Sequence, residues 1–281
     1  MMKKIIAILT ALMLLCSSVC MAEAILELVP APQMGSVGGE WAIIALARGG
    51  HTVPDGYYEE YLDRVEEALE ACGGVLHQIK RTEYSRVALA LAALGENPAD
   101  FRGYDLLAPL TETDMVKIQG NNGPIWALIA LNSGDYPGTE EAKAKLTDEI
   151  LSQQNEDGGF GIAPGQASNV DMTAMALTAL AGNEAAAACI EAALGFLAAA
   201  EYESSESCAQ ALVAYSALNM SEEAEEMRGM LEEYAVDGGY RHLMSEEAVN
   251  GMATEQAGYA IAAHERMRSG QNALFDMRDA K

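Results

Sequence analysis

Six segments of this chain are apolar on nearly every side. In each, an acidic or amide residue is followed five and six places later by Ala and then by Leu or Ile. The six begin at Glu40, Glu83, Asn122, Asp171, Glu206 and Glu255, with successive gaps of 43, 39, 49, 35 and 49 residues. A helix without a polar face belongs in a protein interior. Because each gap holds one returning helix and two turns, the spacing predicts a repeat array.

The segments between them have one charged face and one apolar face, which is typical of helices on an outer surface. They cover 57–71, 140–154, 184–199 and 221–234, with a shorter one over 104–116. Cap and breaker residues precede four of these acidic or amide residues, namely Gly38-Gly39, Asn121, Asn169 and Ser205. Strand patterns are few, so we expect an all-α fold with six inner and five to six outer helices. Six pairs is the number that closes an α/α toroid, a double-walled barrel, and closure explains the lack of polar capping repeats.

The first residues have the pattern of a secretory signal peptide. Lys3 and Lys4 precede an apolar run over 5–15, and Ala22-Glu23-Ala24 forms a small-x-small cleavage site. Neither Cys16 nor Cys20 follows the Gly or Ala of a lipoprotein site. We therefore expect a signal peptide over 1–24 and a single secreted domain over 25–281, released from the cell or associated with its envelope. No membrane insertion is expected after cleavage.

Net charge and cysteine content limit which ligands, disulfides and metal sites can be expected. The net charge is −25, which repels nucleic acid and anionic lipid but tolerates cationic ligands or metal ions. Cys72, Cys189 and Cys208 show no scaffold or metal spacing, so we interpret them as small buried hydrophobic residues. One disulfide plus a free thiol stays open. The four histidines form no ligand-spaced set, and neither a metal site nor another cofactor is expected.

Two Gly-Gly-aromatic motifs carry a family resemblance. Gln154-x3-Gly158-Gly159-Phe160 and Asp237-Gly238-Gly239-Tyr240 resemble the repeats of the terpene-cyclase and protein-prenyltransferase superfamily. More closely, the chain resembles the prenyltransferase-repeat, transcobalamin-like toroids of secreted and surface proteins of Gram-positive bacteria. The matching stretches are 40–42, 82–86, 103–106, 119–126, 171–175, 206–210 and 253–256. The resemblance implies a toroid, export, and a ligand in or above a central cavity.

The enzyme chemistries of that superfamily match this chain poorly. A class II terpene cyclase uses Asp-x-Asp-Asp-Thr-Ala, and here Asp171 keeps the middle acid while both flanking acids are absent. Aromatic residues make up only 6% of the chain, few for guiding a carbocation. Thr254-Glu255-Gln256 lacks the zinc-binding histidine of a prenyltransferase, and Ser207-Cys208-Ala209-Gln210 lacks the frame of a thioester. A carbohydrate-active lyase or hydrolase with paired carboxylates stays open.

The repeat predicts that the acids gather at one end. Inner helices of a toroid run parallel, so Glu40, Glu83, Asn122, Asp171, Glu206 and Glu255 should form one ring. Such acids ordinarily complement the helix dipole, worth about 0.3–1 kcal/mol each. Alternatively they form an acidic pocket with an aromatic rim, suited to a cationic, metal-bound or sugar ligand. The further candidates for ligand binding are Trp41, Tyr84, Arg86, Trp126, Gln210, Gln256 and Tyr259.

The leading hypothesis is a secreted, non-catalytic binding module that takes a small-molecule, glycan or protein ligand at the cavity mouth. The competing hypothesis is an enzyme of the terpene-cyclase or prenyltransferase type with Asp171 as its acid, or a carbohydrate-active enzyme. A corrinoid carrier is a third possibility, but its ligand would need a second domain. The sequence does not indicate an oligomeric state.

Overall fold

The structure, a computed structural model, describes residues 21–281 and is mostly helical. The predicted signal peptide lies outside these residues except for 21–24. Residues 21–28 are helical, and Ile25 lies fully buried where Gly258 and Ala45 approach each other. A Cβ at Gly258 would meet the Ile25 side chain at 2.6 Å. The missing side chain therefore lets this segment pack closely on the rest of the chain.

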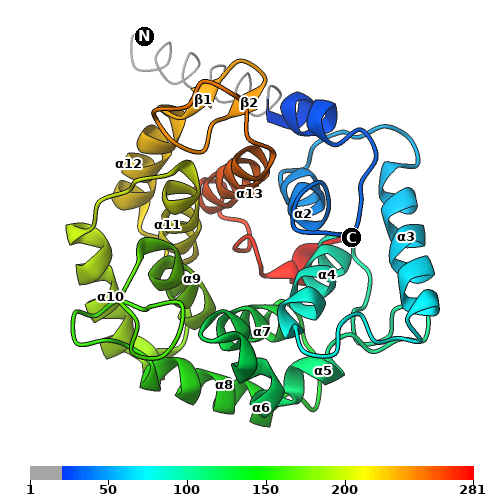
Figure 1. The fold of residues 1–281 in the computed structure, drawn as a ribbon, viewed down its shortest axis with the longest axis horizontal. Coiled ribbons are helices and arrows are strands. Elements are labelled where there is room, and N and C mark those ends of the chain that lie inside the picture. Colours follow the sequence, from blue (N-terminus) through cyan, green and yellow to red (C-terminus); the bar gives the residue numbers. More distant parts are fainter. Residues whose placement is uncertain (1–20) are drawn as a thin grey trace.

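Six helices form an inner circle (Figure 1). They are α2 (Glu40–Arg48), α4 (Arg81–Ala93), α7 (Asn122–Asn132), α9 (Val170–Leu180), α11 (Ser205–Ala217) and α13 (Gly251–Arg268). Each contacts the next, and α13 contacts α2, so the order of contacts closes. Nearly every residue between the ends of α7 is buried. The apolar segments of the sequence are therefore these inner helices.

The remaining helices lie outside this circle (Figure 1). They are α3 (Tyr57–Ala71), α5 (Ala108–Thr111), α6 (Thr113–Val116), α8 (Glu140–Ser152), α10 (Ala187–Ala199) and α12 (Ser221–Glu232). Short 3₁₀ turns cover Lys117–Gln119, Glu184–Ala186 and Met277–Asp279. In α3 the buried residues are Tyr57, Tyr61, Val65 and Leu69, four apart, so one stripe faces the core. The prediction of an all-α fold is confirmed.

The expected helix over 104–116 is wrong in detail. Two single-turn helices, α5 and α6, take its place and are separated at Glu112, whose φ and ψ are −77° and 71°. Pro109 fits the first turn of α5, where its missing N–H costs nothing. Asp105 caps this turn by accepting hydrogen bonds from the Leu107 and Ala108 amides. The outer layer is therefore thinner here than the pattern predicts.

Helix caps agree with the prediction at Gly39 and Asn169 and differ at the other two positions. The Asn169 side chain accepts a hydrogen bond from the Met172 amide at 2.9 Å, as an N-cap should. Helix α11 is capped by Ser204 instead of Ser205. The Asn121 amide points away from its helix and donates to the Gly161 carbonyl. Side-chain direction, which the sequence does not specify, decides these cases.

The two Gly-Gly-aromatic motifs perform the same structural task. The Phe160 amide donates to Thr173 Oγ1 at 3.0 Å, and the Tyr240 amide donates to Thr254 Oγ1 at 2.9 Å. The Phe160 and Tyr240 carbonyls accept the amides of the N-cap residues of α9 and α13. The first glycine of each motif has φ near +85°, which favours glycine. Each motif therefore fixes the loop that enters an inner helix; the second also forms the hairpin of β1 (Ala235–Val236) and β2 (Gly239–Tyr240).

The last ten residues cross the circle at the C-terminal ends of the inner helices (Figure 1, red). Arg48 donates to the Leu274 and Asp276 carbonyls at 2.9 and 2.8 Å and to Asp279 at 2.7 Å. Arg266 also pairs with Asp279. This arrangement brings Phe275 against Trp126 of α7 and Tyr259 of α13. We call residues 272–281 the C-terminal strap.

The cysteine interpretation needs one correction. Cys189 and Cys208 are buried, and burial raises the pKa of their thiols to about 11 and about 12. Cys72 is exposed instead of buried, because it follows the last turn of α3. All three are free within the described chain. No helix in residues 21–281 is long and apolar enough to cross a bilayer.

Candidate functional site

The N-terminal ends of the inner helices lie together. Polar contacts join neighbours at this end: Gly38–Glu255, Glu40–Arg86, Asp171–Ser207 and Gln210–Gln256. Thr82, at the start of α4, bonds Gln119, just before α7. Asn122 and Asp171 line one cavity. We call this end the N-terminal mouth, and all six predicted ring positions belong to it.

Arg86 forms ion pairs with two of the ring acids. Its Nε lies 2.6 Å from Glu40 Oε2, and one terminal nitrogen lies 2.5 Å from Glu83 Oε2. Glu40 is fully buried and also accepts hydrogen bonds from the Gly35 amide and the Tyr61 hydroxyl. Burial raises the pKa of Glu40, and Arg86 opposes that rise. The pair is thus an internal one, with little of Glu40 left for a ligand.

Glu255 is buried without a cation. It is 1% exposed, and its Oε1 accepts the Gly38 amide at 2.7 Å. Its Oε2 has no partner in the described chain. Burial raises the pKa of Glu255 to about 7, and the nearby charge of Glu40 adds to the rise. Glu40 and Glu255 therefore both hold the loop before α2, but only Glu40 is neutralised.

Asp171 and Glu206 have different partners. Asp171 Oδ1 accepts the Ser207 hydroxyl at 2.6 Å. Burial raises the pKa of Asp171, and the Glu206 charge adds to this effect. Glu206 lies 2.7 Å from His242 Nδ1, and this contact raises the pKa of His242. Asp171 is thus half-buried at the mouth with a hydroxyl, and no cation, as its hydrogen-bond partner.

The predicted aromatic residues pack on one another. Trp41 lies 5.0 Å from Trp126 and 5.6 Å from Tyr259, measured between ring centroids. Phe275 of the C-terminal strap lies 5.7 Å from Trp126 and 6.4 Å from Tyr259. Trp126 and Tyr259 are buried and Trp41 is half-buried. These four rings therefore form an aromatic cluster in the middle of the circle. Of the four, only Trp41 is partly exposed at the mouth.

The other predicted residues differ in whether they contact these rings. Tyr84 is buried, and the Arg81 guanidinium lies over its ring at 5.6 Å. The buried Gln210 amide donates to Gln256 at 3.0 Å and to the Tyr259 hydroxyl at 2.6 Å. Gln210 therefore satisfies buried polar atoms, while Gln256 is half-buried.

A cavity of about 680 Å³ opens at the N-terminal mouth beside α7, α9 and α11. Its polar lining includes Asn122, Asp171 and Ser207, with Glu201 and Glu203 from the loop after α10. Its apolar walls include Met172, Met175 and Phe196. Among residues 21–281, no Lys, Arg or His lines it. The cavity is therefore acidic with an apolar wall. The sequence did not predict this combination, because Phe196 lies on an outer helix and Glu201 and Glu203 lie in the loop after it.

The arrangement favours binding over nucleophilic catalysis. A serine nucleophile needs a base within hydrogen-bond reach. Ser207 donates to Asp171, and no hydrogen bond joins it to His242 in the described chain. Within residues 21–281 no group of three or more His, Cys, Asp or Glu side chains could hold a metal ion. The Glu206–His242 pair was not predicted, since the two residues are 36 positions apart.

Comparison of the chain with models of protein families finds no match, and comparison with curated proteins finds none either.

Proposed function

We propose that this chain is an α/α toroid of the prenyltransferase-repeat type, secreted after removal of residues 1–24, and that it binds a ligand without transforming it. The alternation of inner and outer helices and the closed order of inner contacts support the toroid. The two Gly-Gly-aromatic motifs, with their matching roles before α9 and α13, support a repeat origin. Released and envelope-associated protein are both compatible with this proposal.

The ligand is an organic cation with an apolar body, bound in the cavity at the N-terminal mouth. One observation carries this assignment: Asp171 lines a cavity of about 680 Å³ to which the described residues contribute three acids and no basic side chain. Three other ring acids already have a partner within the chain: Glu40 and Glu83 share Arg86, and Glu206 contacts His242. A bound ammonium group would supply the positively charged partner that the Asp171 carboxylate lacks, and Phe196 would contact the apolar part of the ligand.

Isothermal titration calorimetry with 2-phenylethylamine tests the proposal, with 2-phenylethanol as its neutral counterpart. We expect the amine to bind and the alcohol to bind at least about tenfold more weakly, because a charge-assisted hydrogen bond contributes roughly 1.5–3 kcal/mol. Asp171→Asn should remove this preference. Asp148→Asn, an exposed change on α8 with the same change in net charge, should leave it unchanged.

Equal binding of amine and alcohol, or an Asp171→Asn variant that keeps the preference, would contradict a cation site. Binding of a neutral oligosaccharide in place of the amine would instead identify the glycan ligand that the sequence left open. Binding by a variant is compared with binding by the original chain only if the two have the same melting temperature.

One observation favours the competing enzyme. Burial raises the pKa of Asp171, as a proton donor requires. The four rings in mutual contact oppose it, because they occupy the centre that a folded isoprenoid would need. Turnover of an isoprenoid by purified protein, abolished by Asp171→Asn, would establish the enzyme.

A further inference from the structure

Large apolar side chains are exposed at the N-terminal mouth, on the segments that lead into the inner helices. The described chain exposes eight such side chains, and seven of them lie on these segments or in the helical turn that follows. Val75 and Ile79 precede α4. The other five precede or begin α2, α7, α9 and α13 and are between 36% and 58% exposed: Val37, Ile118, Ile162, Met244 and Met252. We call these five residues the apolar rim, since exposed apolar residues gathered at one place mark an interaction surface.

One part of the apolar rim borders the acidic cavity directly. Ile162 lines that cavity together with Asp171. The Asn121 amide, just before α7, donates to the Ile162 carbonyl at 2.9 Å. A Cβ at Gly120 would lie only 2.5 Å from the same carbonyl, so the two segments approach closely. The turn that carries Ile118 therefore lies beside the loop of Ile162 and extends the apolar wall of the cavity.

The other part of the apolar rim lies on the far side of α11. His242 contacts Glu206 of α11 and belongs to the same loop as Met244. A Cβ at Gly251, the first residue of α13, would lie 3.6 Å from the Val37 side chain, so Val37 continues this part. Because α11 lies between α9 and α13 in the order of contacts, the acidic cavity has apolar side chains on both of its sides.

The cations at this end leave the surroundings of the cavity acidic. Lys117, next to Ile118 in the sequence, pairs with a carboxylate of α8. Arg241 donates to two backbone carbonyls, and Glu246 and Glu247 follow it in the same loop. Lys80 is exposed, but it precedes α4, which lies on the side of α7 away from α9. A partner on the apolar rim therefore meets a surface on which acids outnumber unpaired cations.

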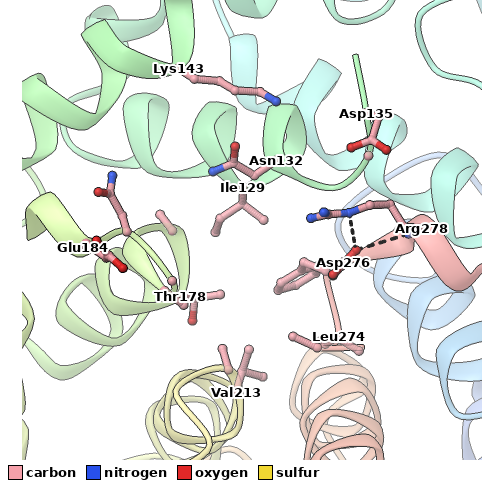
Figure 2. Close-up of a pocket in the computed structure, with 18 residues that line it drawn as sticks. Ile129, Asn132, Asp135, Lys143, Thr178, Glu184, Val213, Leu274, Asp276 and Arg278 are labelled. Atoms are coloured by element: carbon pink, nitrogen blue, oxygen red, sulfur yellow. Dashed lines mark hydrogen bonds and ion pairs between the residues drawn. The ribbon is translucent and has the colours of Figure 1, made fainter. Parts of the chain in front are cut away.

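The opposite end of the circle differs in both respects. A cavity of about 620 Å³ lies there, and Figure 2 shows Lys143 and Arg278 on the same side of it as Asp135 and Asp276. Arg278 Nε lies 2.8 Å from Asp276. None of the exposed large apolar side chains of residues 21–281 lines this cavity. Its charge is thus mixed, and the combination of exposed apolar residues with excess acid belongs to the N-terminal mouth.

We propose that the N-terminal mouth docks a polypeptide that presents a lysine or arginine between apolar side chains. The basic side chain enters the acidic cavity at Asp171, and its apolar neighbours pack on the apolar rim to either side. This inference rests on the proposed cation site and adds the class of partner that the site takes. A second copy of the chain would bring acids against acids, and an anionic membrane surface would be repelled, so charge complementarity favours a basic polypeptide.

Calorimetric titration with the peptide acetyl-Leu-Leu-Lys-Leu-Leu-amide tests the proposal. One altered peptide has glutamine in place of lysine, and a second has serine in place of every leucine. We expect each alteration to weaken binding at least about tenfold, the first through loss of a charge-assisted hydrogen bond and the second through loss of apolar contact. Asp171→Asn should bind the lysine and glutamine peptides within about twofold of each other, because the partner of the ammonium group is gone.

The double variant Ile118→Gln/Met244→Gln tests the apolar rim. Both residues are exposed and neither lines the acidic cavity. This variant should bind the lysine peptide at least about fivefold more weakly than the original chain and 2-phenylethylamine within about twofold of it. The matched control Ile118→Leu/Met244→Leu keeps the apolar surface and should retain binding of the peptide. Circular dichroism should show the same melting temperature for both double variants.

Three results would overturn the docking proposal while the cation site stands, provided that 2-phenylethylamine still binds. They are equal affinity for the leucine and serine peptides, equal losses in the two double variants, and no binding of the lysine peptide at millimolar concentration. If Asp171→Asn changes binding of neither the amine nor the peptide, the cation site fails together with the docking proposal. Dimerisation in sedimentation experiments, lost in Ile118→Gln/Met244→Gln, would identify a second copy as the occupant and would also overturn the proposal.

Discussion

Replacing Arg86 with methionine tests how the buried charge at the N-terminal mouth is stabilised. Glu40 is fully buried and lies 2.6 Å from Arg86 Nε, and its other side-chain contacts are the Gly35 amide and the Tyr61 hydroxyl. Methionine keeps the apolar stem but leaves Glu40 without a cation. Breaking a buried pair from one side costs about 3–5 kcal/mol of unfolding free energy. We expect a loss of about 3 kcal/mol, because the two uncharged donors remain.

Urea denaturation followed by circular dichroism measures this loss, with Arg64→Met as the control. Arg64 forms an exposed pair with Glu60 four residues away, so its removal should cost less than about 1 kcal/mol. The loss in Arg86→Met should also depend on pH. Without Arg86 the pKa of Glu40 in the folded state rises further above its unfolded value, so the folded state binds the additional proton. Its unfolding free energy then falls as pH rises, and the loss is smaller near pH 5 than near pH 8.

The double variant Glu40→Gln/Arg86→Met shows whether the unpaired charge of Glu40 causes the loss of stability. Because it removes both buried charges, it should recover most of the stability lost in Arg86→Met. The reasoning is refuted if Arg86→Met costs no more than Arg64→Met. It is also refuted if the double variant is as unstable as the single one, since the loss would then come from packing of the arginine stem.

Three further predictions concern stability. Glu255→Gln should remove a component of the unfolding free energy that falls between about pH 4.5 and about pH 7, because burial raises the pKa of Glu255 to about 7 in the folded state; an unchanged slope in pH-dependent denaturation would contradict this. Phe275→Ala should cost about 3 kcal/mol and shift tryptophan fluorescence through contact with Trp126, whereas an unchanged spectrum would show that the strap does not insert. Asn169→Ala should cost about 1 kcal/mol by chemical denaturation through loss of the α9 cap, and a loss within error would argue against the cap.

The outer helices were predicted well where their pattern is regular. Helix α3 spans Tyr57–Ala71, the predicted range, because its apolar residues recur every four positions. The prediction failed at 104–116, where Pro109 and the turn around Glu112 divide the segment. Burial of Cys72 was also predicted wrongly, since its position after the last turn of α3 leaves it in solvent. Local breaks and helix ends depend on backbone geometry that residue type alone does not define.

Only part of the candidate site could be predicted from the sequence. The six ring positions could be found because each lies in the N-terminal part of an inner helix at the same place in the repeat. Their partners could not. Arg86 was a candidate for one acid, but it bridges Glu40 and Glu83 at once. His242 reaches Glu206 from a loop with no ligand spacing, and Phe275 reaches the centre from the strap, which the repeat does not include.

The amino-acid sequence by itself determined the helical repeat and the acids at the start of the inner helices, because periodicity and capping are local properties of the chain. Only the tertiary structure decided which acids pair with cations, that aromatic rings meet in the centre, and where the acidic cavity at the N-terminal mouth lies. Those features depend on contacts between residues up to more than 200 positions apart, such as Arg48 with Asp279. Helix packing determines which distant residues come into contact, and no short segment of sequence contains that information.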